Sequence, residues 1–263
     1  MQSAFGDNIT VEVDGHLAIV TINRPPHNHV SVQFMKELAD AFEAIDAEPG
    51  LRASVLQAEG KNFCAGADLE SPTGLAGSGI TVQAALNPLY DQAVRLFSIE
   101  KPIVAAVQGA AVGAGLGLAL VADFRIASPD ARFSANFVKL GFHPGFGITH
   151  TLPRLIGASK AELMCLTGRR VKAEEGLPWG LVDEIAPLEE LRAAARRLAG
   201  EIAENAPLAI VATRKTLRGD LAAAVRAQTG IEHREQTILR ETEDFREGVR
   251  SVSERRPGNF VGR

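Results

Sequence analysis

A β-branched, uncharged segment runs directly into a glycine-rich one in the middle of the chain: Ile103-Val104-Ala105-Ala106-Val107, then Gln108-Gly109-Ala110-Ala111-Val112-Gly113-Ala114-Gly115-Leu116-Gly117. The first five residues predict a buried strand, and the glycines predict a turn into a buried helix. Small residues let a backbone approach a ligand closely, and a helix start offers free N–H groups with a partial positive charge. The segment therefore predicts an α/β fold that presents backbone donors at the beginning of a helix.

A second glycine-bearing element lies upstream, directly after a predicted strand, and reads Asn62-Phe63-Cys64-Ala65-Gly66-Ala67-Asp68-Leu69. Together the two elements can supply N–H donors to one oxyanion as it develops. Tight packing between a strand and a helix explains either element alone equally well. A Rossmann dinucleotide site is disfavoured, because the glycines after Val107 do not follow G-x-G-x-x-G. The chain also contains no phosphate-binding P-loop, no G-x-S-x-G and no H-E-x-x-H motif.

The composition excludes several classes of protein. The 263 residues are 46% hydrophobic and 23% charged with a net charge of -4, which indicates an ordinary globular protein without a positive field for nucleic acid or an anionic membrane. The two cysteines, Cys64 and Cys165, lie far apart and outside any metal-spaced cluster, so we expect no metal site and a reducing cytoplasm. The uncharged run 103–122 reaches membrane-span length, but its glycines favour a buried core segment.

Periodicity predicts alternating strands and helices in the first part of the chain and helices in the last part. A hairpin is expected at Ile9–Val13 and Leu17–Ile22, and Ser31 is expected to cap the helix that follows. Further elements are predicted as strands at 53–57, 103–107, 124–127 and 132–137, and as a helical stretch with a break near Gly157 at 152–166. We divide the chain into an α/β core at 1–187, with right-handed βαβ crossovers, and a helical region at 188–263.

Further short motifs follow one another along the chain: Arg24-Pro25 with Asn28 and Ser31, Phe133, Gly141, Pro144-Gly145, Leu152-Pro153-Arg154, Gly157, Ala173-Glu174-Glu175, Gly180-Leu181-Val182, Glu243-Asp244, Glu247-Gly248 and Glu254-Arg255-Arg256-Pro257. In order and spacing, these motifs and the two glycine-rich elements resemble the enoyl-CoA hydratase/isomerase (crotonase) family. The resemblance covers essentially the whole chain. No single motif is sufficient for this assignment, which rests on the order and spacing of all of them.

The resemblance implies a ββα spiral core, a helical C-terminal region that builds trimers or hexamers, and an acyl-CoA substrate bent into the site. It implies no separate cofactor, because CoA is part of the substrate. By position, the backbone N–H groups of Ala67 and Ala114 would hold the thioester oxygen, with Ala114 in place of the family's usual glycine. The other positions assigned to substrate binding are Arg24, Ala65, Asp68, Leu69, Gly113 and Phe137.

The chain departs from the family at the positions where hydratases and isomerases carry carboxylates. Gly117 and the pair Asn136-Phe137 stand where hydratases have their two glutamates, and Gly145 stands where some isomerases have an acid. Hydration needs one group that activates water and another that gives a proton to the α-carbon. Glycine and phenylalanine do neither, so these positions do not predict the ordinary hydration mechanism.

Four other side chains are candidates for the acid–base role. His143 lies beside Gly145, and imidazole is the side chain that titrates near neutral pH; a loop histidine satisfied by a backbone carbonyl is the alternative. Asp68 follows the first donor, and a helix-capping role is the alternative. Glu70 and Tyr90 can reach the acyl pocket, although a surface and a core position explain them as well.

We therefore expect a lyase of fatty acid metabolism that acts through an oxyanion-hole-stabilised thioester enolate, enoyl-CoA hydratase-like but without both usual glutamates. Isomerisation, C–C hydrolysis and hydration of a special substrate are alternatives, as is an acyl-CoA-binding homologue without catalytic activity. The apolar stripes of the C-terminal helices exceed what these helices can bury among themselves, so a homotrimer or homohexamer is predicted. The stripes consist of Leu188, Leu191, Ala195, Leu198 and Ile202, and of Ile231, Ile238, Phe245 and Val249.

Overall fold

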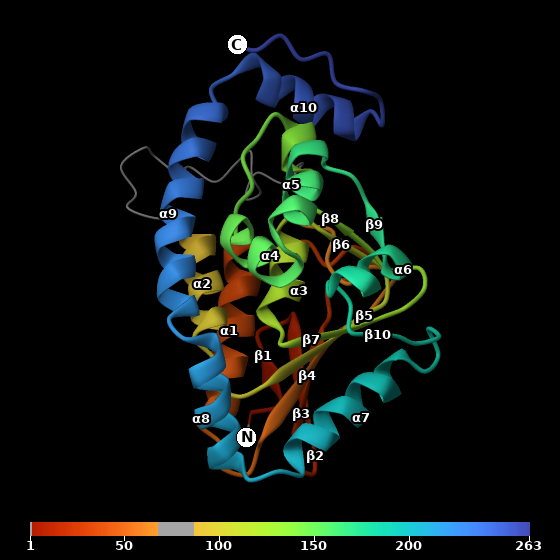
Figure 1. Ribbon diagram of the computed structural model, residues 1–263, viewed down its shortest axis with the longest axis vertical. Helices are drawn as coiled ribbons and strands as arrows, with labels where there is room; N and C mark the ends of the chain where they lie inside the picture. The colour runs from red at the N-terminus through yellow and green to blue at the C-terminus, as the bar shows by residue number, and fades with distance from the viewer. Residues whose placement is uncertain (1, 68–86) are drawn as a thin grey trace.

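The computed structural model describes residues 2–67 and 87–263. A seven-stranded sheet lies at its centre, with a three-stranded sheet beside it (Figure 1). In spatial order the strands of the large sheet are β1 (Ala4–Phe5), β2 (Ile9–Asp14), β3 (Leu17–Ile22), β4 (Ala53–Ala58), β5 (Ile103–Val107), β7 (Phe124–Ala127) and β10 (Glu184–Ile185). Strands β1 to β3 pair antiparallel, and every later neighbour pairs parallel.

The elements predicted at the beginning of the chain are present. The hairpin around Gly15 pairs β2 with β3 from Ile9↔Ile22 to Asp14↔Leu17. Ser31 caps the next helix as predicted, because its hydroxyl accepts a hydrogen bond from the Phe34 N–H at 3.2 Å. Parallel strands need crossover connections, and α1 supplies the one between β3 and β4. The α-helices are α1 (Val32–Asp46), α2 (Pro88–Phe97), α3 (Ala114–Val121), α4 (Ile148–Ile156), α5 (Ala158–Thr167), α6 (Ala173–Gly176), α7 (Leu191–Ala203), α8 (Pro207–Arg218), α9 (Leu221–Leu239) and α10 (Glu243–Ser253).

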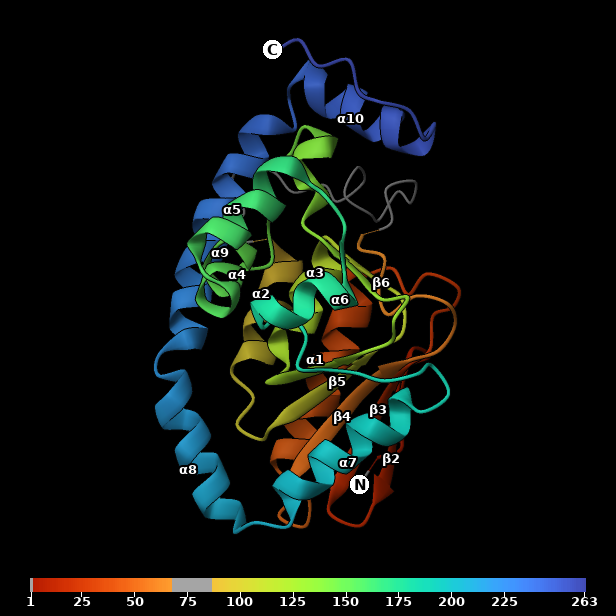
Figure 2. The same cartoon turned by 45° about the vertical axis from the view of Figure 1, so that its right-hand side comes forward.

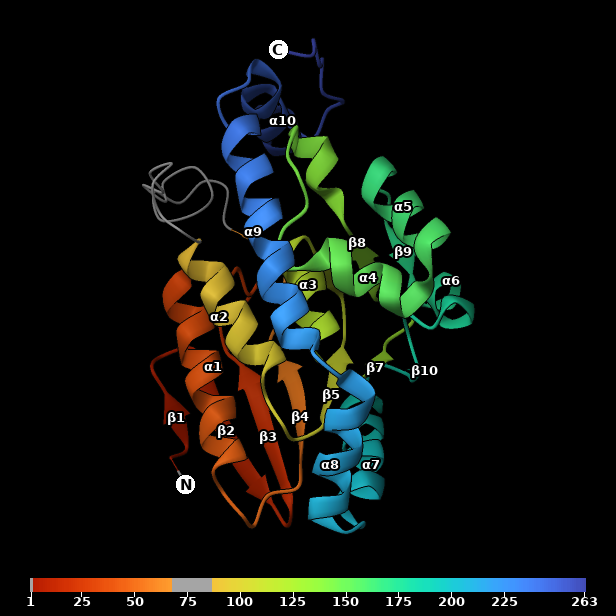
Figure 3. The same cartoon turned by 60° about the vertical axis from the view of Figure 1, so that its left-hand side comes forward.

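Helices cover both faces of the large sheet, as Figures 2 and 3 show from two sides. Val20 packs in the core cluster with α1, α2 and α3, whereas its neighbour Ile19 points to the other face and packs with α7. Central strands that are buried on both faces consist of continuous runs of apolar residues, and these runs allowed the strands to be predicted from the sequence. Leu191 and Ala195 of the first apolar stripe are buried against this sheet of their own chain. Their assignment to a subunit contact was therefore wrong.

The small sheet consists of β6 (Ala110–Val112), β8 (Arg132–Ser134) and β9 (Val171–Lys172). The strand predicted at 132–137 was too long. Its partner β6 ends at Val112, because Gly113 with φ 56° turns the chain into α3, so β8 has no partner beyond Ser134. The 3-10 helices η1 (Asn136–Leu140) and η2 (Leu177–Trp179) follow β8 and α6. The uncharged run 103–122 thus forms β5, β6 and α3, and among the described residues no helix is long and apolar enough to cross a membrane.

The last helices return along the molecule, with α9 beside α2 and α4, and α10 on η1. Arg214 and Arg218 tie α8 to Asp123, each at 2.9 Å. In the second apolar stripe Phe245 is buried within its own chain, 4.9 Å from Phe142 between ring centroids. Ile231 and Ile238 of that stripe are exposed. Helix α7 lies beyond residue 187 but packs on the sheet of the core. The division of the chain into two regions between residues 187 and 188 therefore stays a proposal.

Candidate active site

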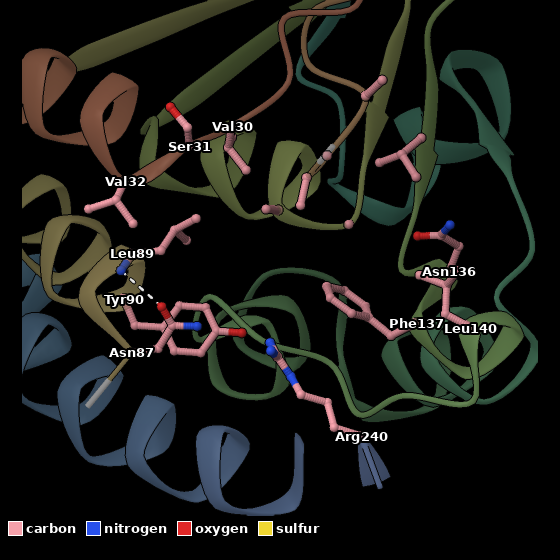
Figure 4. A pocket seen from close by; sticks show the side chains of 16 residues that line it. Val30, Ser31, Val32, Asn87, Leu89, Tyr90, Asn136, Phe137, Leu140 and Arg240 are labelled. Atoms are coloured by element: carbon pink, nitrogen blue, oxygen red, sulfur yellow. Dashed lines mark hydrogen bonds between the residues drawn. The ribbon is translucent and has the colours of Figure 1, made fainter. Parts of the chain in front are cut away.

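A cavity opens between the starts of α1, α2 and α3, the 3-10 helix η1 and the end of α9 (Figure 4). Aliphatic and aromatic side chains line most of it. The polar side chains that line it, among the described residues, are Ser31, Asn87, Tyr90, Asn136 and Arg240. Five positions that the sequence assigned to the site are brought together in this lining: Ala65, Ala67, Gly113, Ala114 and Phe137.

The two glycine-rich elements meet because their backbones pair. The Cys64 N–H donates to the Ala110 carbonyl at 2.9 Å, and the Val112 N–H donates to the Cys64 carbonyl at 3.0 Å. Gly66 has φ +95°, and a Cβ on it would lie 2.8 Å from the Val112 carbonyl oxygen and 4.0 Å from the Ala114 nitrogen. Only glycine fits this conformation and this approach. The Ala67 backbone is thereby held beside the first turn of α3.

Two backbone donors face this junction. Ala114 is the first residue of α3, and the first N–H groups of a helix have no acceptor within that helix. The peptide unit between Gly66 and Ala67 has one carbonyl and one N–H. Its carbonyl accepts a hydrogen bond from the Val30 N–H at 2.9 Å, and this bond does not involve the Ala67 N–H. Within residues 2–67 and 87–263, neither the Ala67 N–H nor the Ala114 N–H donates a hydrogen bond to the protein. Such donors can bind an oxyanion that lies in the cavity.

Aromatic side chains occupy the space at the positions where the resemblance implies carboxylates. A Cβ on Gly117 would collide with the ring of Phe146, and one on Gly145 would collide with the hydroxyl of Tyr90. Phe137 itself lines the cavity and is buried. Among the described residues, the cavity is lined by no Asp, Glu or His. Nor does the described part of the chain hold three His, Cys, Asp or Glu side chains placed to bind a metal ion.

A hydrogen-bonded chain fixes the phenol of Tyr90. The Gln236 amide nitrogen donates to the His143 carbonyl at 2.8 Å, so its amide oxygen faces Tyr90 and accepts the phenolic proton at 2.7 Å. Burial raises the pKa of Tyr90, and the carboxyl of Glu232 raises it further. The phenol therefore stays neutral, with its proton directed to Gln236. Figure 4 shows the Tyr90 hydroxyl pointing toward the guanidinium of Arg240.

Two predicted site residues, His143 and Arg24, do not line the cavity, and two others fall outside the described residues. His143 does not line the cavity, and its ring Nδ1 lies 2.7 Å from the Pro144 carbonyl oxygen. Arg24 donates to the His29 carbonyl at 2.6 Å and to the Ser31 hydroxyl at 3.2 Å, and through Ser31 it contacts the cavity lining. Asp68 and Leu69, like Glu70, fall outside the described residues.

Two ionisable side chains of the C-terminal helical region were missed by sequence reasoning. Glu232, fully buried on α9, accepts from the Gly147 N–H at 2.7 Å and from the N–H and hydroxyl of Thr149 at 3.0 and 2.6 Å. It thus holds the segment that places Phe146 against Gly117, and burial raises the pKa of Glu232 to about 7. Arg240 follows α9 and lines the cavity. A basic residue at a helix C-terminus is common on protein surfaces, so nothing in the sequence around Arg240 predicted a cavity position.

The chain is similar to known proteins over nearly its whole length. The profile of the Enoyl-CoA hydratase/isomerase family matches residues 12–263. The chain is 36% identical over 259 residues to an (E)-benzylidenesuccinyl-CoA hydratase of Thauera aromatica, with 97% of this chain and 99% of that protein covered. It is 32% identical over 259 residues to a crotonyl-CoA hydratase of Syntrophomonas wolfei, with 98% and 99% covered.

Solved structures share the fold. A carnitinyl-CoA hydratase from Mycobacterium avium matches with a TM-score of 0.86 at 32% identity, covering 100% of both chains. An enoyl-CoA hydratase/isomerase from Pseudoalteromonas atlantica matches with a TM-score of 0.86 at 29% identity, covering 97% of this chain and 100% of that one. These matches confirm the crotonase fold expected from the motifs. Over nearly its whole length, therefore, this chain belongs to the enoyl-CoA hydratase/isomerase family.

Proposed function

We propose that the chain binds an acyl-CoA thioester with the thioester oxygen on the N–H groups of Ala67 and Ala114, and that these donors stabilise the derived enolate. One observation carries the proposal: two N–H groups without a protein acceptor among the described residues adjoin one apolar cavity. Removing one such donor in an enzyme of this kind typically costs about 2.7–4 kcal/mol of transition-state stabilisation. The start of α3 adds a partial positive charge at the same place.

This orientation directs the acyl group toward Tyr90 and Phe137. Both are buried aromatic side chains that line the cavity, so they offer an apolar surface to the α- and β-carbons. The CoA moiety is part of the substrate, and the proposed chemistry needs no further cofactor. Metal-free enolate stabilisation of this kind depends on donors that are already positioned before the substrate arrives.

Hydration of an enoyl-CoA is the first candidate reaction, because hydratases are named among the relatives in Thauera aromatica and Syntrophomonas wolfei. The positions of the two family glutamates hold Gly117 and Phe137 here, so water would lack its ordinary base. Tyr90 offers a hydroxyl beside Phe137 in the cavity lining, and a neutral phenol positions a water molecule without deprotonating it. We therefore propose that the protein hydrates an enoyl-CoA slowly. The alternative within this family is a different reaction on a different acyl-CoA, such as isomerisation or C–C hydrolysis.

An acyl-CoA-binding homologue without catalysis is the second candidate. The absence of Asp, Glu and His from the described part of the cavity lining favours it. The two proposed oxyanion donors favour an enzyme. Steady-state assays on a panel of enoyl-CoA thioesters separate the two candidates, with acyl-CoA binding measured on the same protein by calorimetry. Turnover of any member that is lost in Ala114→Pro supports the enzyme, whereas tight binding without turnover of any member supports the binding protein.

We also propose assembly into a trimer or hexamer. Leu208 and Leu217 on α8 are 85% and 73% exposed, and Ile238 on α9 is 59% exposed. Apolar side chains of this size gathered on the C-terminal helices indicate a surface that another subunit covers. Light scattering at micromolar concentration is expected to give a mass of three or six chains, and a stable monomer would refute the proposal.

A further inference from the structure

The end of α9 places a cation in the acyl region of the cavity. Figure 4 shows the guanidinium of Arg240 directed toward the phenol of Tyr90, on the side of the cavity where Phe137 also lies. The ring of Phe142 lies under this guanidinium, 5.4 Å from its central carbon to the ring centroid. A cation over an aromatic face is held electrostatically, so the side chain has a defined position.

The surroundings of Arg240 have the properties of an anion site. Burial lowers the pKa of Arg240 and the Tyr90 phenol raises it, but an arginine keeps its charge throughout the ordinary pH range. Tyr90 and Phe137, which line the cavity with it, are 5% and 6% exposed. A partly desolvated cation gains more from a hydrogen-bonded anion than an exposed one does. The guanidinium has five N–H donors in a planar fork, a geometry that matches the two oxygens of a carboxylate.

We propose that Arg240 recognises a carboxylate at the far end of the acyl group, so that the preferred ligands are CoA thioesters of dicarboxylic acids. The inference rests on the proposed function, because a thioester oxygen on Ala67 and Ala114 directs the acyl chain toward Arg240. The cavity then offers two anchors for one acyl group, neutral N–H donors for the thioester oxygen and a cation for the distal carboxylate. The apolar side chains that line the cavity between these two anchors can pack against the methylene carbons of the acyl group.

A phosphate of CoA is the competing anion. Phosphates on the CoA moiety lie on the other side of the thioester from the acyl chain, whereas Arg240 shares its part of the cavity with buried Leu140, Phe137 and Tyr90. An apolar, buried lining of this kind fits an acyl chain better than a hydrated diphosphate. The two ligands are distinguished by whether affinity depends on the acyl end or on CoA itself.

The test compares matched acyl groups by calorimetry. Butyryl-, valeryl- and hexanoyl-CoA are each compared with succinyl-, glutaryl- and adipoyl-CoA, which have the same chain lengths but end in a carboxylate. In the wild type we expect one dicarboxylic thioester to bind roughly tenfold or more tightly than its neutral partner, as a charge-assisted pair allows. Arg240→Met should abolish this preference, and Arg240→Lys should keep part of it. Arg234→Met, on the exposed face of the same helix, serves as the matched control.

Three results would overturn the inference. Equal affinity for dicarboxylic and neutral thioesters at every chain length in the wild type would refute it while the proposed function stands. Loss of affinity for free CoA and for all thioesters alike in Arg240→Met would assign the cation to a CoA phosphate. Absence of binding for every thioester would refute the proposed function itself, and the inference with it.

Discussion

The phenolic oxygen of Tyr90 occupies the space that a Cβ atom on Gly145 would need. The same Tyr90 donates to Gln236, which donates in turn to the carbonyl of His143, two residues before Gly145. The loop and the phenol are therefore packed as one unit. An acid at position 145 is sterically incompatible with this arrangement.

Gly145→Ala is expected to destabilise the protein, because the added methyl group collides with the Tyr90 hydroxyl and the Gln236 amide. Overpacking of this kind typically costs about 1–3 kcal/mol. The matched control is Gly230→Ala on α9, where a Cβ meets no atom within 4 Å. That change should stabilise the helix by up to about 1 kcal/mol. Urea unfolding measures both, and an unchanged midpoint for Gly145→Ala would show that the phenol moves freely.

Hydration of crotonyl-CoA should be slow. General acid–base assistance contributes roughly 10²–10⁴-fold, and hydration uses it at two carbons. We expect kcat/KM to lie below that of glutamate-bearing relatives by at least one such factor. Tyr90→Phe and His143→Gln then separate the two remaining candidates. Because only Tyr90 lines the cavity, we expect Tyr90→Phe to have the larger effect on kcat, and the opposite order would return the role to His143.

Glu232 should make stability depend on pH. Below about pH 4.5, its ordinary pKa, the carboxyl is protonated in both the folded and the unfolded chain. Since burial raises the folded pKa to about 7, the unfolded chain ionises first as pH rises between these values, and the free energy of unfolding falls. The loss is complete above pH 7 and amounts to at most about 3 kcal/mol for such a shift.

Denaturant unfolding between pH 5 and 8 measures this slope. Glu232→Gln should flatten it, although the amide also loses part of the acceptor capacity for Gly147 and Thr149. Glu162→Gln, at an exposed position on α5, should leave the slope as it is in the wild type. Equal slopes in all three proteins would assign the pH dependence to other groups.

Ala114→Pro should reduce turnover by about 10²–10³ in kcat, because it removes one N–H donor from the proposed oxyanion site. Proline is tolerated at the first position of a helix, so the fold should survive. Ala158→Pro is the matched control, since Ala158 also begins a helix directly after a glycine, away from the cavity. A folded Ala114→Pro protein with normal kcat would reject the proposed donor.

Local signals predicted most of the backbone and pointed to five positions that line one cavity. The hairpin, the Ser31 cap and the two glycine-rich elements follow from turn chemistry, capping and conformational freedom that each belong to a few neighbouring residues. The resemblance also pointed to Gly117 and Gly145 as positions where a carboxylate is expected and missing, but it did not predict the aromatic side chains that occupy the space there. Phe146 and Tyr90 reach those glycines through tertiary packing.

The C-terminal helices show the same limit. An apolar stripe indicates that one face of a helix is buried, but it does not identify the surface that buries it. For this reason α7 was assigned to a contact with a neighbouring subunit, although it packs on the sheet of its own chain. Glu232 and Arg240 lie on or directly after α9, more than a hundred residues from the glycine-rich element at 108–117. Only the packing of α9 beside α2 and α4 brings Arg240 to the cavity and Glu232 to the loop that flanks it.

The most direct test is the infrared stretching frequency of a bound thioester carbonyl. Butyryl-CoA labelled with carbon-13 at the thioester carbon gives a band that can be followed in the presence of the protein. If Ala67 and Ala114 hold the oxygen, the band should shift to lower frequency on binding to the wild type and to Ala158→Pro, and shift less on binding to Ala114→Pro. A bound thioester that absorbs at its free frequency in the wild type, or whose full shift persists in folded Ala114→Pro, would contradict the account.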